Sequence, residues 1–158
     1  MVQRSTIDGV SIEQIPKDEL KYSFTRIEPY LQKIREKSYS DWIIPDIYVS
    51  LRKETSTLYM FYKEDAFVGF VITQLIKDPS GEGTLYVWAS YQKPEYNYIK
   101  VGFDFLDKLA NSLGAVAVEF ETSRKGWQRT AKKFNFELVT YTFRKELWVE
   151  EKLKEVGF

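Results

Sequence analysis

The chain has 158 residues, of which 44% are hydrophobic and 16% aromatic, and 23 Lys and Arg balance 23 Asp and Glu. This length suits one domain with a sizeable core, and a neutral chain has no electrostatic attraction for a polyanion, so we expect no nucleic-acid partner. Lack of Cys and His excludes disulfides, cysteine nucleophiles and imidazole-based hydrolysis, and the scattered carboxylates predict no metal site.

The first third of the chain predicts one strand followed by two helices. Alternating apolar residues over Val10–Ile15 indicate the strand. Lys21–Lys37 is predicted to be helical because its apolar residues fall on one face, namely Phe24, Ile27, Leu31 and Ile34. Pro29 is expected to break or kink this helix near Glu28. A second helix is predicted to begin at Pro45 or Asp46.

The middle of the chain predicts three strands. Thr57–Lys63 and Phe67–Leu75 are rich in aromatic and β-branched residues, and the short segment between them indicates a hairpin. The glycine-containing stretch Lys77–Gly83 is predicted to be a loop, and Thr84–Ser90 the next strand.

The last third predicts helices alternating with strands. A helix over Glu95–Leu113 is closed by Gly114, and Val116–Phe120 forms a buried strand. The remaining predicted elements are an amphipathic helix over Arg124–Asn135, a long final strand over Phe136–Leu147, and a terminal helix or turn over Trp148–Phe158.

The N-terminus lacks the apolar core of a signal peptide, and no run approaches 18 apolar residues. We therefore expect a cytoplasmic protein that does not contact a membrane.

The order and lengths of these elements resemble the GNAT superfamily of acyl-CoA N-acyltransferases over nearly the whole chain. Gly69 lies near a usual small-residue position of the family's central hairpin, and Ala131–Phe136 is similar to the end of its last helix, with Asn135 in place of Gly. The resemblance implies a single α/β domain over residues 1–158, with a mixed, mostly antiparallel sheet flanked by helices.

In this family a glycine-rich turn lets the diphosphate of coenzyme A sit on backbone N–H groups at a helix start. The matching positions here are Ile99, Lys100, Val101 and Gly102, with Lys100 where the middle glycine belongs. The resemblance implies that these four residues bind acetyl-CoA if the chain is an enzyme. The bulky side chains favour the alternative that no cofactor binds and that Lys100 is an exposed helix residue.

The family's remaining functional positions also differ. Ala131 stands where a Tyr usually protonates the thiolate leaving group, and Ser123 or Arg124 stands where an Asn contacts the pantetheine arm. Candidate catalytic residues remain in Glu119 and Glu121, on the face of their strand opposite Val118, and in Tyr86 on the preceding strand. The alternative is that both carboxylates are solvated and pair with neighbouring cations.

Two classes of function follow. The slightly preferred one is a GNAT-fold protein with a degenerate acetyl-CoA site that acts by binding a protein partner or a second copy. Residues Arg124–Lys145 resemble small GNAT-like proteins of tailed bacteriophages, which implies a structural or accessory role in the host cytoplasm or virion. The alternative is an active N-acetyltransferase that transfers acetyl to an amine by direct attack.

Overall fold

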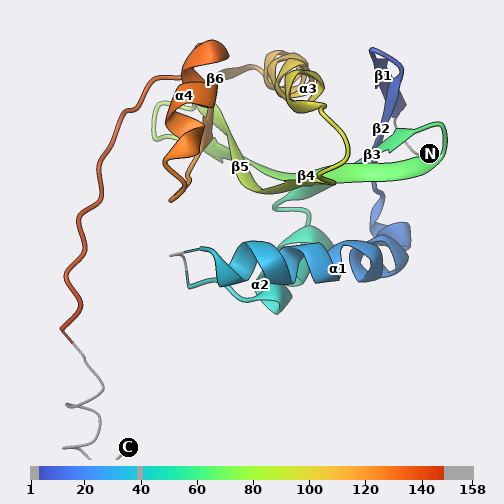
Figure 1. The fold of residues 1–158 in the computed structure, drawn as a ribbon, viewed down its shortest axis with the longest axis horizontal. Helices are drawn as coiled ribbons and strands as arrows, with labels where there is room; N and C mark the ends of the chain where they lie inside the picture. The colour runs from blue at the N-terminus through green and yellow to red at the C-terminus, as the bar shows by residue number, and fades with distance from the viewer. Residues whose placement is uncertain (1–3, 39–40, 148–158) are drawn as a thin grey trace, which may run out of the picture. The chain divides into compact units, whose positions relative to one another are not determined.

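The computed structural model describes residues 4–38 and 41–147, and contacts divide the chain into two compact units, Met1–Ser123 and Arg124–Phe158. The first unit holds a six-stranded sheet with helices on both faces, and the second holds one helix followed by an extended segment (Figure 1). The predicted single domain over residues 1–158 stays a prediction, and the element predicted for 148–158 lies outside the described residues.

The sheet is mixed and mostly antiparallel, as predicted. Its strands follow chain order, and the pairs from β1 to β5 are antiparallel while β5 and β6 are parallel. Their bounds are β1 Arg4–Ile7, β2 Val10–Gln14, β3 Thr57–Lys63, β4 Ala66–Lys77, β5 Gly83–Gln92 and β6 Ala115–Phe120. The predicted hairpin between β3 and β4 is confirmed, and its two-residue turn, Glu64–Asp65, has positive φ at both positions, the conformation that fits strand twist.

Helices cover both faces of this sheet. A 3₁₀ turn, η1 (Lys17–Glu19), leads into α1 (Leu20–Glu36), which lies with α2 (Ile44–Arg52) on one face, whereas α3 (Ile99–Ser112) lies on the other (Figure 1). One core cluster joins α3 to the sheet, and a second joins α1 and α2 to its opposite face. The apolar face predicted for the first long helix is confirmed, since Phe24, Ile27 and Leu31 are buried there.

The expected break at Pro29 is wrong, because α1 runs without interruption from Leu20 to Glu36. Proline removes one helical hydrogen bond and costs about 3 kcal/mol in a helix interior. Four buried side chains anchor α1 to the sheet on both sides of Pro29, and burial of each stabilises by about 1.5–3 kcal/mol. Their packing therefore outweighs the loss at Pro29.

The helix predicted from Glu95 begins four residues later, at Ile99. The Gln92 side chain holds the preceding residues as a loop: its Oε1 accepts the Tyr98 N–H at 2.7 Å, and its Nε2 donates to the Tyr96 carbonyl. At the other end Gly114 has φ 70°, which confirms its predicted role in closing this helix.

The second unit departs most from expectation. Helix α4 spans Gly126–Lys133, and Asn135 has φ 67°, the left-handed conformation that closes a helix. The prediction of a strand over Phe136–Leu147 is wrong. These residues run extended but pair with no strand in the described part of the chain (Figure 1). Local sequence favours extended backbone, but a strand also requires a neighbour for its backbone donors and acceptors.

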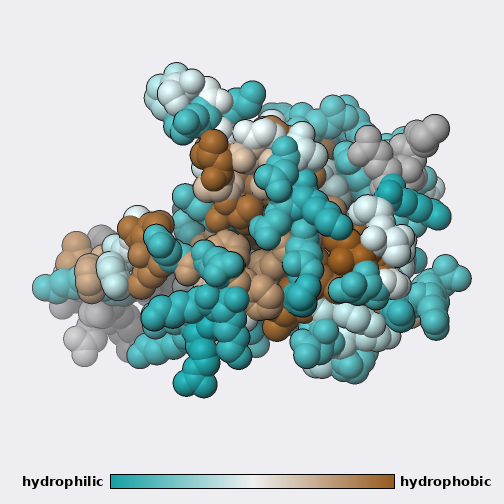
Figure 2. All heavy atoms as spheres, turned by 90° about the horizontal axis from the view of Figure 1, so that it is seen from above, coloured by the Kyte–Doolittle hydropathy of each residue, from teal (hydrophilic) through white to brown (hydrophobic). Residues whose placement is uncertain are grey.

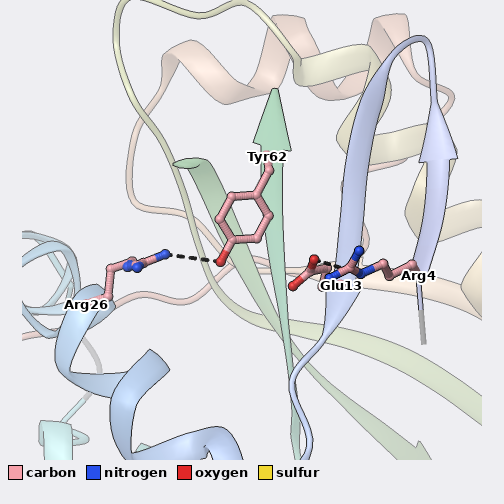
Figure 3. A network of polar contacts seen from close by, with 4 residues as sticks. All are labelled: Arg4, Glu13, Arg26 and Tyr62. Atoms are coloured by element: carbon pink, nitrogen blue, oxygen red, sulfur yellow. Dashed lines mark hydrogen bonds and ion pairs between the residues drawn. The ribbon is translucent and has the colours of Figure 1, made fainter. Parts of the chain in front are cut away.

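A polar network ties α1 to the first three strands (Figure 3). Arg26 Nη1 of α1 donates to the Tyr62 hydroxyl of β3 at 3.2 Å, and Arg4 Nε of β1 lies 2.9 Å from Glu13 Oε1 of β2. Burial raises the pKa of Tyr62, and the Arg26 charge opposes that effect. The three strand residues lie on β1–β3, at the opposite end of the strand order from β6, so we regard the network as structural.

Tyr59 provides a test of the core. Its side chain is 7% exposed, and burial raises the pKa of Tyr59 from 10.0 to about 12. The unfolded chain therefore loses this proton first, so the free energy of unfolding falls as the pH rises from about 10 to 12. The expected loss is on the order of 3 kcal/mol. Urea unfolding across this range should show that loss, and Tyr59→Phe should abolish this part of the pH dependence; equal slopes in both proteins would contradict the assignment.

Candidate functional site

The first unit opens where the parallel strands β5 and β6 part. Their last pair is Val87 with Phe120, after which β5 continues to Gln92 paired with β4 alone. A bulge at Trp88 marks this point, since Ile72 pairs with Ala89 but Thr73 pairs with Val87. In the described residues no strand covers the β6-facing edge of β5 beyond Val87, so that edge offers unpaired backbone groups to a ligand.

The start of α3 lies at the same opening. The Gln92 side chain at the end of β5 binds the backbone of Tyr96 and Tyr98, while the Phe103 ring of α3 lies 6.2 Å from the Phe120 ring of β6. The N-terminal part of α3 and the loop before it therefore contact the ends of both strands. A helix offers its first N–H groups no internal carbonyl, and its positive end favours an anion.

The four predicted cofactor-binding residues, Ile99–Gly102, form the first turn of α3. They differ in burial and in the groups that they contact. Val101 is buried in the core, and the exposed Lys100 directs its Nζ along the helix to Asp104 Oδ2, 2.7 Å away. This ion pair raises the pKa of Lys100. A Cβ added at Gly102 would meet nothing within 4 Å. The turn is thus open at Gly102, and the Lys100 ammonium is held by a carboxylate.

Two of the three predicted catalytic residues lie on neighbouring strands, and the third follows directly after one of them. Tyr86 of β5 is the register partner of Glu119 in β6, and Glu121 follows directly after that strand. Val118 and Phe120 pack against the α3 cluster, which confirms that Glu119 belongs to the opposite face. Burial, followed by the negative charges of Glu121 and Glu119, raises the pKa of Tyr86. The hydroxyl therefore stays protonated at neutral pH beside two exposed carboxylates.

Three residues near this opening were missed as site candidates. The Trp42 ring lies 6.4 Å from the Trp88 ring at the bulge, and the Arg35 guanidinium lies 5.9 Å from the Trp42 ring centroid. Both tryptophans are partly buried against the core cluster that joins α1 and α2 to the sheet. No local spacing links residues 35, 42 and 88, so only the tertiary fold reveals the group.

The end of α1 is also tied to the end of β6. Ser123 Oγ donates to the Lys37 carbonyl at 3.2 Å. This contact places the C-terminus of α1 beside the residues that follow Glu121, and thus bounds the opening on the face that carries the two carboxylates.

No family model and no curated protein matches this sequence. Solved structures do match the fold. An acetyltransferase from Trypanosoma brucei has a TM-score of 0.61 at 13% identity, covering 87% of this chain and 99% of its own. A ribosomal-protein-alanine N-acetyltransferase from Brucella melitensis has a TM-score of 0.63 at 15% identity, with the same coverage. A predicted acetyltransferase from Clostridium acetobutylicum, solved with acetyl-CoA, has a TM-score of 0.60 at 15% identity and covers 94% of this chain and 99% of its own.

The chain has the GNAT fold. These matches cover 87–94% of the chain, so the predicted fold class is confirmed. Among the described residues of this GNAT-fold chain, no helix is long and apolar enough to cross a membrane, and no cluster of acidic side chains is arranged to hold a metal ion.

Proposed function

We propose that this GNAT-fold chain is an acetyl-CoA-dependent N-acyltransferase acting on an amine. The observation that carries the proposal is the end of β5–β6 pairing at Val87 and Phe120, which leaves the following edge of β5 free directly after the Tyr86–Glu119 pair. The structurally similar C. acetobutylicum protein, solved with acetyl-CoA, supports the choice of cofactor. Its low identity to this chain makes direct binding measurements necessary.

Each part of the opening has a role in this proposal. Acetyl-CoA would supply an acetyl group activated as a thioester. The amine nitrogen would form the new C–N bond while the C–S bond breaks, and coenzyme A would leave as a thiolate that is protonated by solvent. The backbone N–H groups of Ile99, Lys100 and Val101 would hold the diphosphate, beside Gly102, whose own N–H donates to the Tyr98 carbonyl. The free edge of β5 would align the remainder of the molecule. Glu119 or Glu121 accepts the proton that the attacking amine loses. Tyr86, which remains protonated, donates a hydrogen bond to a polar group of the acceptor.

A second candidate function is protein binding by a non-catalytic GNAT-fold chain, such as a phage structural or accessory protein. Two contacts favour it. The Lys100–Asp104 pair adds a carboxylate to the first turns of α3, and Gln92 already occupies the Tyr98 N–H. The sequence adds Ala131, which cannot donate a proton to a leaving thiolate. In this case the chain binds no cofactor, and its function depends on a partner surface.

Gly102→Ala separates the two candidates. The position is helical and unobstructed, so alanine should raise the free energy of unfolding by about 0.5–1 kcal/mol. If the diphosphate lies against this turn, the added Cβ should weaken acetyl-CoA binding at least tenfold in calorimetry. Asn111→Ala, at an exposed position near the other end of α3, is the matched control: it should also stabilise the helix but leave the affinity unchanged.

The wild-type titration sets the threshold for this experiment. We expect acetyl-CoA to bind with a Kd below roughly 100 μM, about 5.5 kcal/mol. A wild-type protein that shows neither heat nor a thermal shift at saturating acetyl-CoA would exclude the enzyme and leave the binding protein.

A further inference from the structure

A hollow of about 450 Å³ lies at the end of the sheet away from the opening between β5 and β6. It is lined by the end of β2, the starts of β3 and β5, the second half of β4, the last turn of α3 and the turn that follows α2. Small-molecule sites have volumes of roughly 300–1,000 Å³. All of its lining residues belong to the unit Met1–Ser123, and we call it the distal hollow.

The distal hollow is separate from the groups assigned to acetyl transfer. It borders the last turn of α3, whereas Ile99–Gly102 form the first turn, and a helix of 14 residues is about 21 Å long. Its residues Tyr59 and Leu85 lie in the core cluster under α3, on the face of the sheet opposite to Glu119. Ligand binding here therefore does not depend on the proposed reaction.

Hydroxyl groups lie on the strands that line the distal hollow. Thr57 and Thr73 are register partners in β3 and β4, and Thr73 is only 3% exposed. The Tyr59 hydroxyl shares a hydrogen bond with the Thr57 side chain. Among the described residues, none hydrogen-bonds the Thr73 hydroxyl. Because buried polar groups normally have a partner, this hydroxyl is suited to one that a ligand supplies.

The charge at the distal hollow is negative. Glu54 is exposed at its rim, and no Lys or Arg is among the described residues that line it. Glu54 also forms no ion pair with another described residue. The last turn of α3 adds the negative end of a helix dipole. These charges favour a cation and disfavour an anion.

Leucine side chains supply the apolar part of the distal hollow. Leu85 is fully buried, whereas Leu75 and Leu113 are 36% and 46% exposed. Figure 2, which views the molecule from the α3 side of the sheet, shows hydrophobic side chains exposed between hydrophilic ones. Such a lining fits a ligand that has an apolar chain and one polar end.

The turn that carries Glu54 is held in a defined conformation. Glu54 has φ 62°, a left-handed value that residues other than glycine rarely adopt. The N–H groups of Thr55 and Ser56 both donate to the Ser50 carbonyl, at 3.0 and 3.4 Å, and the Ser50 hydroxyl hydrogen-bonds the hydroxyls of the same two residues. The carboxylate is therefore attached to a preformed turn, which lowers the entropic cost of binding.

We propose that the distal hollow binds a linear alkylammonium ion. The ammonium pairs with the Glu54 carboxylate and donates hydrogen bonds to the Thr57 and Thr73 hydroxyls. The alkyl chain lies against Leu75 and Leu85. A polyhydroxylated ligand such as a sugar fits less well, because it would leave both the leucines and the carboxylate without matching groups.

The probe is n-hexylammonium, with n-hexanol and n-hexanoate as neutral and negative ligands of the same chain length. Each is titrated into the full chain and followed by two-dimensional NMR of the backbone amides. We expect hexylammonium to bind with a Kd in the millimolar range, hexanol at least about threefold more weakly because it lacks the ion pair, and hexanoate least of all. Hexanol or hexanoate binding as tightly as hexylammonium, or no binding of any probe, would overturn the proposal.

The position of the shifted amides separates this site from the proposed acceptor site, which also takes an amine. Binding in the distal hollow should shift the amides of Thr57, Thr73 and Ser112, which line it. Shifts confined to Glu119 and Glu121 would mean that the probe binds the acceptor site instead, and would contradict the proposal. Failure of acetyl-CoA to bind, by contrast, would leave the shifts in the distal hollow unchanged.

Glu54→Gln removes the charge and keeps the side-chain size. It should lower the affinity for hexylammonium to that for hexanol, a loss of about threefold to fivefold. Glu64→Gln is the matched control, because Glu64 is also exposed, also has positive φ (48°) and follows the other end of β3. It should leave the affinity unchanged. Equal effects of the two substitutions would indicate general attraction to negative charge and exclude the site.

Thr73→Val tests the hydroxyl with a side chain of the same shape. The affinity for hexylammonium should fall by about twofold or more, because one hydrogen bond to the ammonium is lost. The free energy of unfolding should not fall, since no described group hydrogen-bonds this hydroxyl. Unchanged affinity together with lower stability would assign the Thr73 hydroxyl to the fold and remove it from the site.

Discussion

Gly69→Ala should be the most destabilising single-methyl change in the sheet. A Cβ at this buried position would lie 2.3 Å from the Tyr91 carbonyl oxygen and 3.2 Å from the Gln92 Cα. Both are backbone atoms of the neighbouring strand β5, so no side-chain rotation relieves the contact. Overpacking typically costs 1–3 kcal/mol, and with backbone on the opposing side we expect at least about 3 kcal/mol. Urea unfolding, followed by circular dichroism, measures the loss.

Gly102→Ala is the control for this experiment, because it adds the same methyl group where nothing lies within 4 Å. The two variants should change the free energy of unfolding in opposite directions. A Gly69→Ala protein as stable as wild type would mean that β4 and β5 are not as closely paired as described. Because Gly69 pairs with Gln92, partial unfolding of this variant should also loosen the loop that leads into α3.

The second large effect concerns the two carboxylates beside Tyr86. Replacing both, Glu119→Gln with Glu121→Gln, removes the proton acceptors of the proposed reaction while preserving side-chain size. General-base catalysis contributes about 10²–10⁴-fold, so kcat/KM should fall by about that factor. The assay is release of free coenzyme A from acetyl-CoA with an aliphatic diamine or a peptide α-amine as acceptor. Acetyl-CoA affinity should remain unchanged.

Glu82→Gln is the matched control, since Glu82 is an exposed carboxylate just before the opposite end of β5. It should leave both activity and acetyl-CoA affinity unchanged. An active wild-type enzyme whose activity survives the double substitution would exclude both carboxylates as the base. The amine acceptor attacks only in its deprotonated form. The loss of kcat/KM in the double variant, relative to wild type, should therefore be largest at low pH, where more of the amine is protonated.

The sheet was largely predictable because its signals are local. Runs of aromatic and β-branched residues and the short segment between them located β3 and β4; the bounds of β3 agree and those of β4 differ by one or two residues. Strand β1 was missed, although Asp8–Gly9 with positive φ at both positions closes its hairpin with β2. An Asp-Gly pair is a strong hairpin signal; the short sequence Arg4–Ile7 has too few apolar residues to indicate a strand by itself.

The errors arose where tertiary context decides the outcome. The continuous helix through Pro29 depends on burial of its face against the sheet, which no local propensity encodes. The segment Phe136–Leu147 has strand-forming residues, but pairing depends on the availability of another edge. The residues of this segment favour extended backbone, but a strand forms only where a second strand pairs with it, so the predicted strand is not observed.

The candidate site was predictable in part. Topology placed Tyr86, Glu119 and Glu121 on neighbouring strands, and their proximity follows from the β5–β6 register. The aromatic pair Trp42–Trp88 could not be predicted, because its members belong to distant segments that meet only through packing of α1 on the sheet. The ion pair of Lys100 with Asp104 follows from helical spacing of four residues, a signal that the sequence does contain.

The bulge at Trp88 has a consequence for how this scaffold can diversify. Upstream of it, β5 is fixed on both sides; downstream, one side is anchored in the antiparallel ladder and the other is open. Substitutions that reshape the open side therefore leave the ladder from β1 to β5 intact. Changes on this open side can therefore alter the surface of the sheet without a matching loss of structural integrity.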